Sequence, residues 1–281
     1  MSSFHHSVDG PRIGLAHGPG MIEFIRSHPG TVDYLEIPFE QLRHAPALRA
    51  LQDEVPLVLH CASLSVAGFV PPTLETIAAV ADEARAVKTP WIGEHLAFIA
   101  AAPLPDEPRD RPTVLTYTVC PQLSEETLDC VEENLAFLRR RMPVPIILEN
   151  SPQYFFVPGS TLTMSDFVRA VAERCDVDLL LDLSHFLITS RNMGVDPVRD
   201  IERLPLERVV EVHVSGMSRQ SGVVWDDHAQ PASPLVFDLL KRIMRRARPQ
   251  ALTIEYNWSA GFPATLLCEH IERARSLLQV A

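Results

Sequence analysis

Short apolar runs alternate with amphipathic segments along the chain. Leu179–Leu181, three leucines that end at Asp182, is typical of a strand buried on both faces, as in a parallel sheet. In the segment Thr73–Val87, apolar residues recur at i, i+3, i+4 and i+7, which indicates a helix with one buried face. The same pattern predicts eight strands, at Arg12–Leu15, Tyr34–Ile37, Leu57–His60, Trp91–His95, Pro145–Asn150, Asp178–Asp182, Val209–Val214 and Ala251–Glu255.

Helical segments separate these strands. Ser124 and Thr163 are residue types that cap helices, and Pro263 suits the first turn of the last helix. The expected helices are Met21–Ser27, Ala45–Leu51, Thr73–Val87, Ser124–Met142, Thr163–Arg174, Asp196–Arg203, Pro234–Arg246 and a last one from Pro263.

Eight strand–helix units in 281 residues predict an α/β protein with a single (β/α)8 TIM barrel that spans residues 1–281. A doubly wound open sheet is the rival, but no glycine-rich phosphate loop follows any strand. Residues 1–10 are expected to form a disordered tail. Ala101–Pro112 has four prolines and five charges in twelve residues, which predicts a long loop over 101–123 on the face that carries the site.

Composition narrows the class of protein. The net charge of −11 argues against a nucleic-acid partner, since phosphate contacts need a basic surface. No apolar run approaches the roughly 20 residues that cross a bilayer, and Met1–Pro11 has no apolar core of a signal peptide, so we expect no membrane partner. Five scattered cysteines without a CxxC motif favour a reducing cytoplasm and argue against a thiolate zinc site.

Groups able to bind metal recur at the ends of the expected strands. In a (β/α)8 barrel the chemistry is built at the C-terminal ends of the strands. Seven of the eight strands end near such a group: Glu36, His60, His95, Glu149, Asp182, His213 and Glu255. His185 follows the sixth strand, and Trp225–His228, with Asp226 and His228, follows the seventh.

This set is too large for one tetrahedral zinc, and it predicts two or three metal ions bridged by carboxylates. Imidazole and carboxylate without thiolate suit iron, zinc or manganese. Taken alone, one such histidine or aspartate is more often structural; the recurrence at seven strand ends favours a shared site. Histidines elsewhere are expected to face solvent: His5, His6, His28, His44 and His270.

Short motifs that run through most of the chain occur together in one known family: Tyr34–Glu36, Leu57–Ser65, Gly93–Leu96, Ile147–Ser151, Leu180–Asp182, Glu211–His213 with Gly216, Asp226–His228 and Ile254–Glu255. In these motifs the chain resembles the multinuclear non-haem iron-dependent oxidative enzymes, whose first studied member oxidises cysteines of the methanobactin precursor peptide.

The resemblance implies a TIM barrel of the xylose-isomerase type that holds two or three iron ions in mixed Fe(II)/Fe(III) states and uses dioxygen. It also implies a peptide substrate made on ribosomes and a partner protein that binds the peptide leader. The implied metal ligands are His60, His95, Glu149, Asp182, His213, Asp226, His228 and Glu255. Glu36, Asn150 and Asn257 are candidates to orient the substrate.

Three positions depart from the family pattern. Ser184-His185 stands where asparagines are usual, so His185 is either a substitute ligand, which we favour, or a group behind the ligands. Tyr256-Asn257 replaces an aspartate that usually follows the eighth strand, and Glu94 replaces the aspartate before His95. Two alternatives therefore stay open: a redox-neutral metal enzyme, such as a sugar isomerase or zinc hydrolase, and an inactive barrel that serves as a binding subunit.

Overall fold

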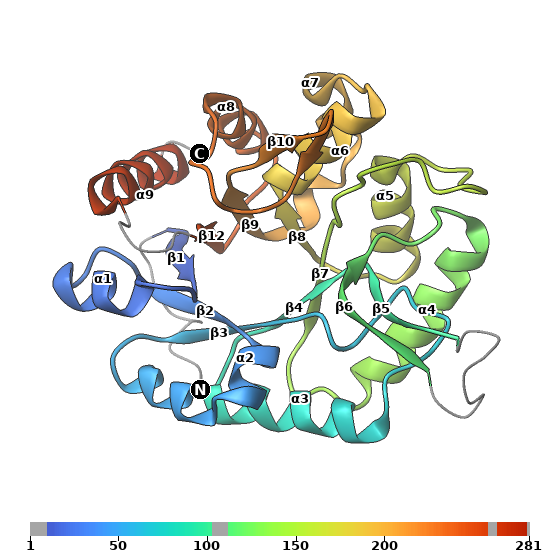
Figure 1. Cartoon of the computed structure of the whole chain (residues 1–281), viewed down its shortest axis with the longest axis horizontal. Coiled ribbons are helices and arrows are strands. Elements are labelled where there is room, and N and C mark those ends of the chain that lie inside the picture. The colour runs from blue at the N-terminus through green and yellow to red at the C-terminus, as the bar shows by residue number, and fades with distance from the viewer. Residues whose placement is uncertain (1–9, 103–111, 258–262, 280–281) are drawn as a thin grey trace.

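Eight parallel strands close into a barrel with helices around its outside (Figure 1). The structure, a computed structural model, describes residues 10–102, 112–257 and 263–279. Strand order around the barrel is β1-β12-β9-β8-β7-β4-β3-β2. The (β/α)8 barrel is thus confirmed, and the open sheet is excluded. The strands are β1 (Arg12–Ala16), β2 (Tyr34–Pro38), β3 (Leu57–Cys61), β4 (Ile92–His95), β7 (Ile146–Glu149), β8 (Leu179–Asp182), β9 (Val209–Ser215) and β12 (Ala251–Glu255).

The strands are apolar on both faces because each face meets a different core. On β8, Leu179 and Leu181 pack in the large cluster between the strands and the helices. Leu180 points the other way, into a small cluster inside the barrel with Val58 and Ile147. Successive side chains of a strand face opposite sides, so three leucines in a row serve both cores. The same alternation brings Asp182 to the inner face at the strand end.

Side-chain caps fix where several helices begin. Thr73, Ser124 and Thr163 each accept a hydrogen bond from a backbone amide three residues later. The helices are α1 (Met21–Ser27), α2 (Phe39–His44), α3 (Leu74–Val87), α4 (Glu125–Arg139), α5 (Met164–Arg174), α6 (Leu183–Met193), α7 (Pro197–Asp200), α8 (Pro234–Ile243) and α9 (Ala264–Gln279), with 3-10 turns η2 (Pro46–Asp53), η3 (Ile201–Arg203) and η4 (Leu206–Arg208). None of the described helices is both long and apolar enough to cross a membrane.

Two helices were missing from the sequence prediction. α2 follows β2 directly, and α6 follows β8 directly, where the next helix was expected only near Asp196. The expected helix there exists as α7 and η3. α6 matters for the site because its first turn carries Ser184 and His185.

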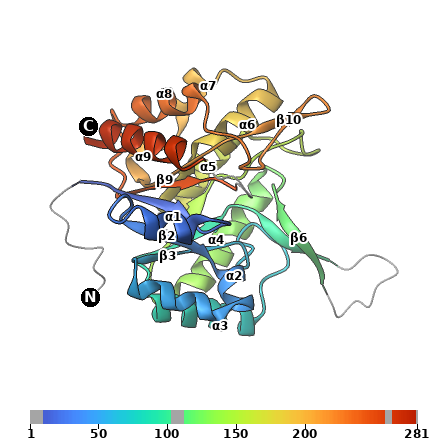
Figure 2. The same cartoon turned by 60° about the vertical axis from the view of Figure 1, so that its left-hand side comes forward.

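The loop expected over residues 101–123 is wrong for part of its length. β5 (Phe98–Ala101) and β6 (Thr113–Val119) pair as an antiparallel hairpin, which projects from the side of the barrel (Figure 2). β-branched and aromatic residues in Thr113–Val119 favour a strand, a signal that the preceding prolines obscured. A second hairpin, β10 (Ser218–Gln220) with β11 (Val223–Trp225), follows β9. Residues 103–111, and the tail expected over 1–10 except Gly10, lie outside the described residues.

Candidate metal centre

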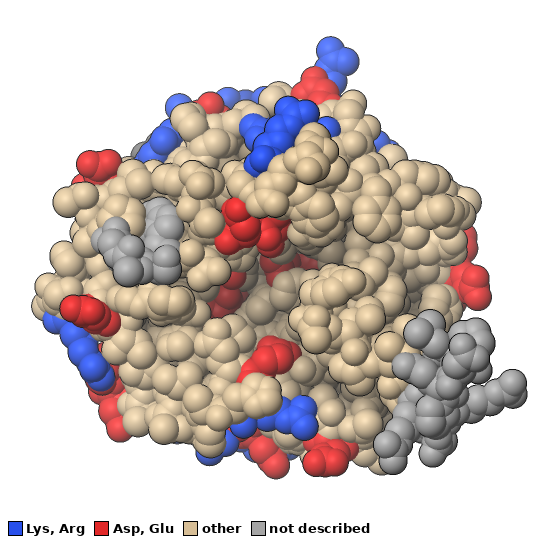
Figure 3. All heavy atoms as spheres, viewed as in Figure 1, with Lys and Arg blue, Asp and Glu red and all other residues tan. Residues whose placement is uncertain are grey.

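A hollow in the face seen in Figure 1 holds acidic atoms in its interior (Figure 3). All nine residues predicted as metal ligands converge at this end of the barrel. They fall into groups whose ligand atoms lie within 4.8 Å of one another: His60–His95–Glu149, His185–Asp226–His228 and Glu149–Asp182–His213–Glu255. Glu36 forms a further group with His60 and His213. Glu149, His60 and His213 each belong to two groups, so the groups adjoin one another.

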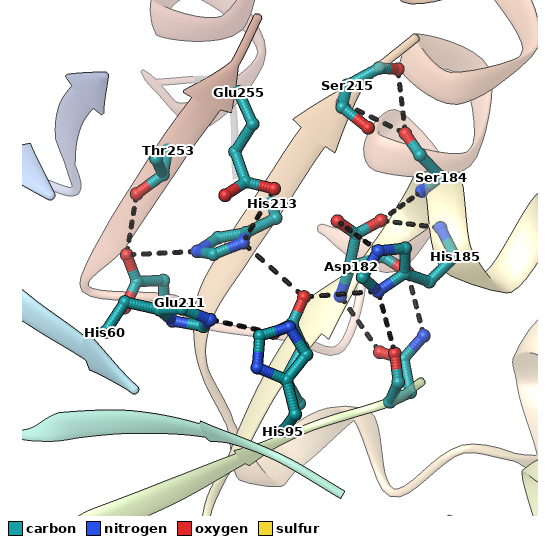
Figure 4. Close-up of polar contacts among 12 residues, drawn as sticks. His60, His95, Asp182, Ser184, His185, Glu211, His213, Ser215, Thr253 and Glu255 are labelled. Carbon is teal, nitrogen blue, oxygen red and sulfur yellow. Dashed lines mark hydrogen bonds and ion pairs between the residues drawn. The ribbon is translucent and has the colours of Figure 1, made fainter. Parts of the chain in front are cut away.

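The imidazole rings surround one space (Figure 4). Ring centroids of His60 and His95 are 4.7 Å apart, and those of His60 and His213 are 5.5 Å apart. His185 lies 6.4 Å from both His95 and His228. The rings come from β3, β4, β9, the start of α6 and the segment after β11, so the closed barrel alone brings them together.

Three imidazoles are anchored through one nitrogen and face the cluster with the other. Nδ1 of His95 lies 3.3 Å from the Cys61 carbonyl oxygen, and Nδ1 of His185 lies 3.0 Å from the Asn150 carbonyl oxygen. Nε2 of His213 lies 3.1 Å from a carboxylate oxygen of Glu36. Metal-binding histidines characteristically donate their second ring N–H to a carbonyl or carboxylate, which fixes the ring orientation.

Buried atoms of the cluster lack hydrogen-bond partners among the described residues. Asp226 Oδ1 and His228 Nε2 are 2.9 Å apart, but their geometry is not that of a hydrogen bond. Such atoms are costly to bury unless something else satisfies them, and atoms that converge on a shared point suit a cation. The other such atoms in the cluster are His60 Nδ1, Glu149 Oε2, Asp182 Oδ2 and His213 Nδ1. This donor set of imidazole and carboxylate fits iron, zinc or manganese.

The carboxylates hold protons on their neighbouring imidazoles. Burial acts to lower the pKa of His60, but Glu36 and Glu149 outweigh it and raise the pKa to about 10. His228 shows the same balance, with a pKa raised to about 9. In His95 burial dominates and lowers the pKa. Despite burial, adjacent carboxylates also raise the pKa of His185 and His213.

Two of the carboxyl groups have raised pKa values, which favour their neutral, protonated form. Burial raises the pKa of Glu36 to about 7 and that of Asp182 to about 6. Glu255 behaves oppositely: burial acts to raise its pKa, but the charges of His213 and His228 lower it to about 2. The cluster therefore holds excess negative charge that imidazolium protons offset, and a cation can take the place of those protons.

Asp182 has two structural duties at once. Its Oδ1 caps α6 by accepting hydrogen bonds from the amides of Ser184 at 2.6 Å and His185 at 2.7 Å. Its Oδ2 stays free of hydrogen bonds within the described chain and faces the cluster. Asn150 holds this arrangement, because its side chain makes two 2.9 Å hydrogen bonds with the backbone of Asp182. His185 thereby lies inside the cluster, with Nε2 at 2.9 Å from Asp226 Oδ2.

The segment after β11 presents Asp226 and His228 through a strained backbone. His228 has a φ of 51°, a left-handed conformation that is unfavourable for residues other than glycine. The Asn257 amide donates to the His228 carbonyl oxygen at 2.8 Å and supports it. Asp227 turns away and accepts from the Ala229 amide at 3.2 Å. Of the two aspartates, Asp226 joins the cluster and Asp227 does not.

A buried carboxylate beneath the cluster was not singled out from the sequence. Glu211 lies in the barrel interior and accepts hydrogen bonds from Tyr34 at 3.1 Å, Trp91 at 2.7 Å and Thr253 at 2.7 Å. It lies 3.7 Å from Nε2 of His213. Its position two residues before His213 puts both side chains on the same face of β9, a signal that the sequence did contain. Another expectation is wrong: His270 is buried, not solvent-facing, and bonds the Tyr256 hydroxyl.

Gly93 leaves the space that the His60 ring occupies. A Cβ at this position would lie 2.8 Å from His60 Nδ1 and 3.0 Å from Leu180 Cδ1. We expect Gly93→Ala to displace the ring, to destabilise the protein by about 1–3 kcal/mol and to lower metal content. Gly18→Ala is the control, since its nearest neighbour, the Tyr256 carbonyl oxygen, is 3.8 Å away. Chemical denaturation and elemental analysis measure both effects, and an unchanged metal content in Gly93→Ala would contradict this prediction.

Fold and site together define a class: a (β/α)8 barrel with a candidate multinuclear metal centre at the C-terminal ends of its strands. The chain belongs to the family described as RiPP precursor modification enzyme MbnB/TglH/ChrH, whose model matches residues 12–279. RiPPs are peptides that are made on ribosomes and then modified, so the resemblance drawn from the sequence is confirmed.

Similar proteins include members of the UPF0276 group. A UPF0276 protein of Streptomyces avermitilis is 30% identical over 263 residues, covering 90% of this chain but 52% of the relative. The chain thus spans about half the length of that relative. A UPF0276 protein of Acaryochloris marina is 27% identical, with 82% of each chain covered.

Solved structures share the fold. Endonuclease IV from Thermus thermophilus matches with a TM-score of 0.59 at 16% identity, over 96% of this chain and 100% of that one. A 3-keto-D-glucoside 4-epimerase from E. coli matches with a TM-score of 0.60 at 16% identity, over 95% and 99% of the two chains. A xylose isomerase domain protein from Planctomyces limnophilus has a TM-score of 0.59 at 16% identity, over 95% and 97%. At these identities the likeness concerns the fold alone.

Proposed function

We propose that the protein is a multinuclear iron enzyme that uses dioxygen to oxidise a residue, a cysteine in the simplest case, of a ribosomally made peptide. Family membership supports a peptide substrate. The observation that carries the proposal is the convergence of nine imidazole and carboxylate side chains with buried, unsatisfied donor atoms. Cys61 is not one of the converging side chains. Its thiol is on the face of β3 away from His60 and lies 3.9 Å from a carboxylate oxygen of Glu40.

The grouped side chains divide the proposed ligand duties. His60, His95 and Glu149 would hold one ion, and Glu149, Asp182, His213 and Glu255 a second. His185, Asp226 and His228 would hold a third, and His185 would then be a ligand. When bound, iron supplies a Lewis acid for a thiolate and the one-electron steps by which dioxygen is reduced.

The three residues expected to orient substrate have different surroundings. Glu36 lies within hydrogen-bond distance of Nε2 of His213, and the amide of Asn150 is engaged by the Asp182 backbone, so we assign both to positioning ligands. Asn257 is exposed, and its backbone amide bonds the His228 carbonyl oxygen, which supports a role in contacting the peptide. A carboxyl of pKa about 7 at Glu36 can also hold or release a proton shared with His213 at neutral pH.

A partner protein that binds the peptide leader is part of this proposal. Large apolar side chains exposed on segments that follow the barrel strands support it. Phe155 and Phe156, after β7, are 67% and 62% exposed, and Tyr117 on the β5–β6 hairpin is 67% exposed. Aromatic side chains are enriched at protein–protein interfaces relative to the rest of a protein surface.

Metal content and oxygen uptake test the proposal. We expect protein purified without oxygen to hold two or three irons per chain by elemental analysis and Mössbauer spectroscopy, and to consume dioxygen when peptide is added. Zinc or manganese without oxygen consumption would overturn the oxidative reading and favour the redox-neutral metal enzyme. Protein that retains no metal at all after anaerobic purification would favour the inactive binding subunit.

A further inference from the structure

A second cavity adjoins the candidate metal centre. It measures about 480 Å³ and lies between the end of α6, the β10–β11 hairpin and Tyr154, which follows β7. Its lining includes two guanidinium groups, Arg191 and Arg219, with Asn192 and Ser218. Basic atoms gather over the β10 region in Figure 3, beside the acid-lined hollow. The pocket therefore places positive charge next to an otherwise acidic mouth.

The two guanidinium groups have no anionic partner within the described residues. Arg191 contacts the Met217 sulfur at 3.5 Å, and Arg219 contacts the Gly222 carbonyl oxygen at 3.4 Å, both long contacts to neutral atoms. Among residues 10–102, 112–257 and 263–279, Ser218 also has a buried hydroxyl without a hydrogen-bond partner. Paired guanidinium groups and a free hydroxyl match a carboxylate, which accepts several hydrogen bonds at once.

The pocket is built on the same elements as the metal centre. Asn192 joins α6 to β11 through two 2.9 Å hydrogen bonds with the Val224 backbone. Trp225, at the end of β11, precedes Asp226 and stacks on Tyr154 with ring centroids 4.5 Å apart. α6 carries His185 in its first turn and the pocket at its other end, so both sites share one rigid support.

Helix geometry sets the spacing between the two sites. Arg191 comes six residues after His185, which is about 9 Å along the axis of a helix that rises about 1.5 Å per residue. The two side chains leave the helix about 120° apart, so about 9 Å is the least distance between the sites. An extended peptide advances about 3.4 Å per residue, so about three residues span the same distance. A substrate bound at both places would carry its anionic group at least about three residues from the modified position.

We propose that this pocket binds a carboxylate of the peptide substrate, at least about three residues from the residue that is modified. The carboxylate comes from an acidic side chain or from the C-terminus of the peptide. This inference rests on the peptide-modifying function proposed above. The pocket would fix the direction in which the peptide crosses the mouth, because its two guanidinium groups attract the carboxylate to one side of the metal centre.

Calorimetric titration with three synthetic peptides tests the pocket, with serine in place of the reactive cysteine. Acetyl-Ser-Gly-Gly-Asp-Gly-amide offers a side-chain carboxylate, acetyl-Ser-Gly-Gly-Gly a free C-terminus, and acetyl-Ser-Gly-Gly-Asn-Gly-amide neither. We expect at least one carboxylate peptide to bind about tenfold more tightly than the asparagine peptide, because guanidinium–carboxylate hydrogen bonds are strong. The carboxylate peptide that binds more tightly shows whether the pocket takes an acidic side chain or the C-terminus.

Variants connect this preference to the two arginines. The double variant R191Q/R219Q should bind all three peptides equally. Arg140→Gln should keep the tenfold preference, because this exposed residue follows α4 at the opposite end of the barrel, where β7 begins. Equal affinities for the three peptides in the unaltered protein, no measurable binding, or a preference that survives in R191Q/R219Q would each overturn the proposal.

The readout separates this inference from the proposed chemistry. Calorimetry needs neither dioxygen nor turnover. A carboxylate preference in a protein that holds zinc and consumes no oxygen would support the carboxylate-binding pocket and refute the proposed iron oxidase. Oxygen uptake with a peptide substrate, together with equal binding of the three peptides, would support the proposed oxidase and refute the carboxylate-binding pocket.

Discussion

Replacing Glu149 by glutamine should reduce bound metal to about one ion per chain. Glu149 belongs to two of the ligand groups, one with His60 and His95 and one with Asp182, His213 and Glu255. A glutamine has the same shape but lacks the negative charge that a ligand shared by two cations would supply. Mutation of a residue that only hydrogen-bonds to a metal ligand already lowers metal affinity by about 10–100-fold. Loss of a ligand shared by two ions should therefore lower the metal affinity of both positions by more than about 100-fold.

The third group should survive this substitution. His185, Asp226 and His228 keep all their donor atoms in Glu149→Gln, so one ion should remain there. Peptide-dependent oxygen uptake should fall by at least about 100-fold. Elemental analysis of anaerobically purified protein measures the first effect, and an oxygen electrode the second.

Glu94→Gln is the matched control for this experiment. Glu94 is buried on β4, which pairs with β7, but on the face of the strand opposite to Gly93 and His95. Burial and the nearby charge of Glu40 raise its pKa well above the usual value, so glutamine resembles its neutral form. Full metal content is expected in Glu94→Gln. Full metal content in Glu149→Gln as well would refute the assignment of Glu149 as a shared ligand.

Metal binding should release protons and strengthen steeply with pH. Without metal, the pKa of His60 is about 10 and that of His228 about 9, so both imidazoles are protonated at pH 7. A metal ion binds only the neutral imidazole, and each bound ion must displace these protons. Release of the protons on His60 and His228 alone makes the overall affinity rise about a hundredfold per pH unit until pH approaches 9, and protons on His185 and His213 steepen this rise.

Calorimetric titration of metal in buffers of different ionisation enthalpy counts these protons. His228→Gln should lower the count by about one near pH 7. His44→Gln, a change at an exposed position on α2, should leave it unaltered. An affinity that does not vary between pH 6.5 and 8.5 would contradict the paired imidazolium–carboxylate cluster.

The same pKa shifts predict how the metal-free protein responds to alkali. A histidine whose folded pKa lies above its unfolded value of about 6.5 stabilises the fold fully below that value. For His228 and His60 this stabilisation is lost as pH rises through about 9 and about 10. Metal-free protein should therefore become less stable between pH 8 and 10, whereas metal-loaded protein should change little over that range.

The barrel was predictable because its strands are apolar on both faces. Short apolar runs such as Leu179–Leu181 favour buried strands when helical segments alternate with them, and the residue types at their ends pointed to the candidate site. α6 was missed because the apolar run continues through Leu183 and hides the change from strand to helix. Asp182 as a cap, with Leu183, Phe186 and Leu187 at helical spacing, was the signal available.

The role of His185 was harder to read for the same reason. A spacing of three residues from Asp182 brings two side chains together only where the chain is helical, so the missing helix left His185 undecided. Anchoring contacts are equally invisible in a sequence. The Asn150 carbonyl that meets His185 lies 35 residues away along the chain, and only the closed barrel brings the two together.

The two roles of Asp182 fix the number of residues between the end of β8 and His185. One carboxylate oxygen starts α6, and the other faces the candidate metals, so the helix cannot begin at another residue without moving both. Each helical residue turns the chain by about 100°, so one residue inserted before His185 would rotate that ring away from Asp226. Point substitutions at Leu183 and Ser184 can be compensated locally. Insertions and deletions between Asp182 and His185 cannot, because the strand end and the first helical turn share a single register.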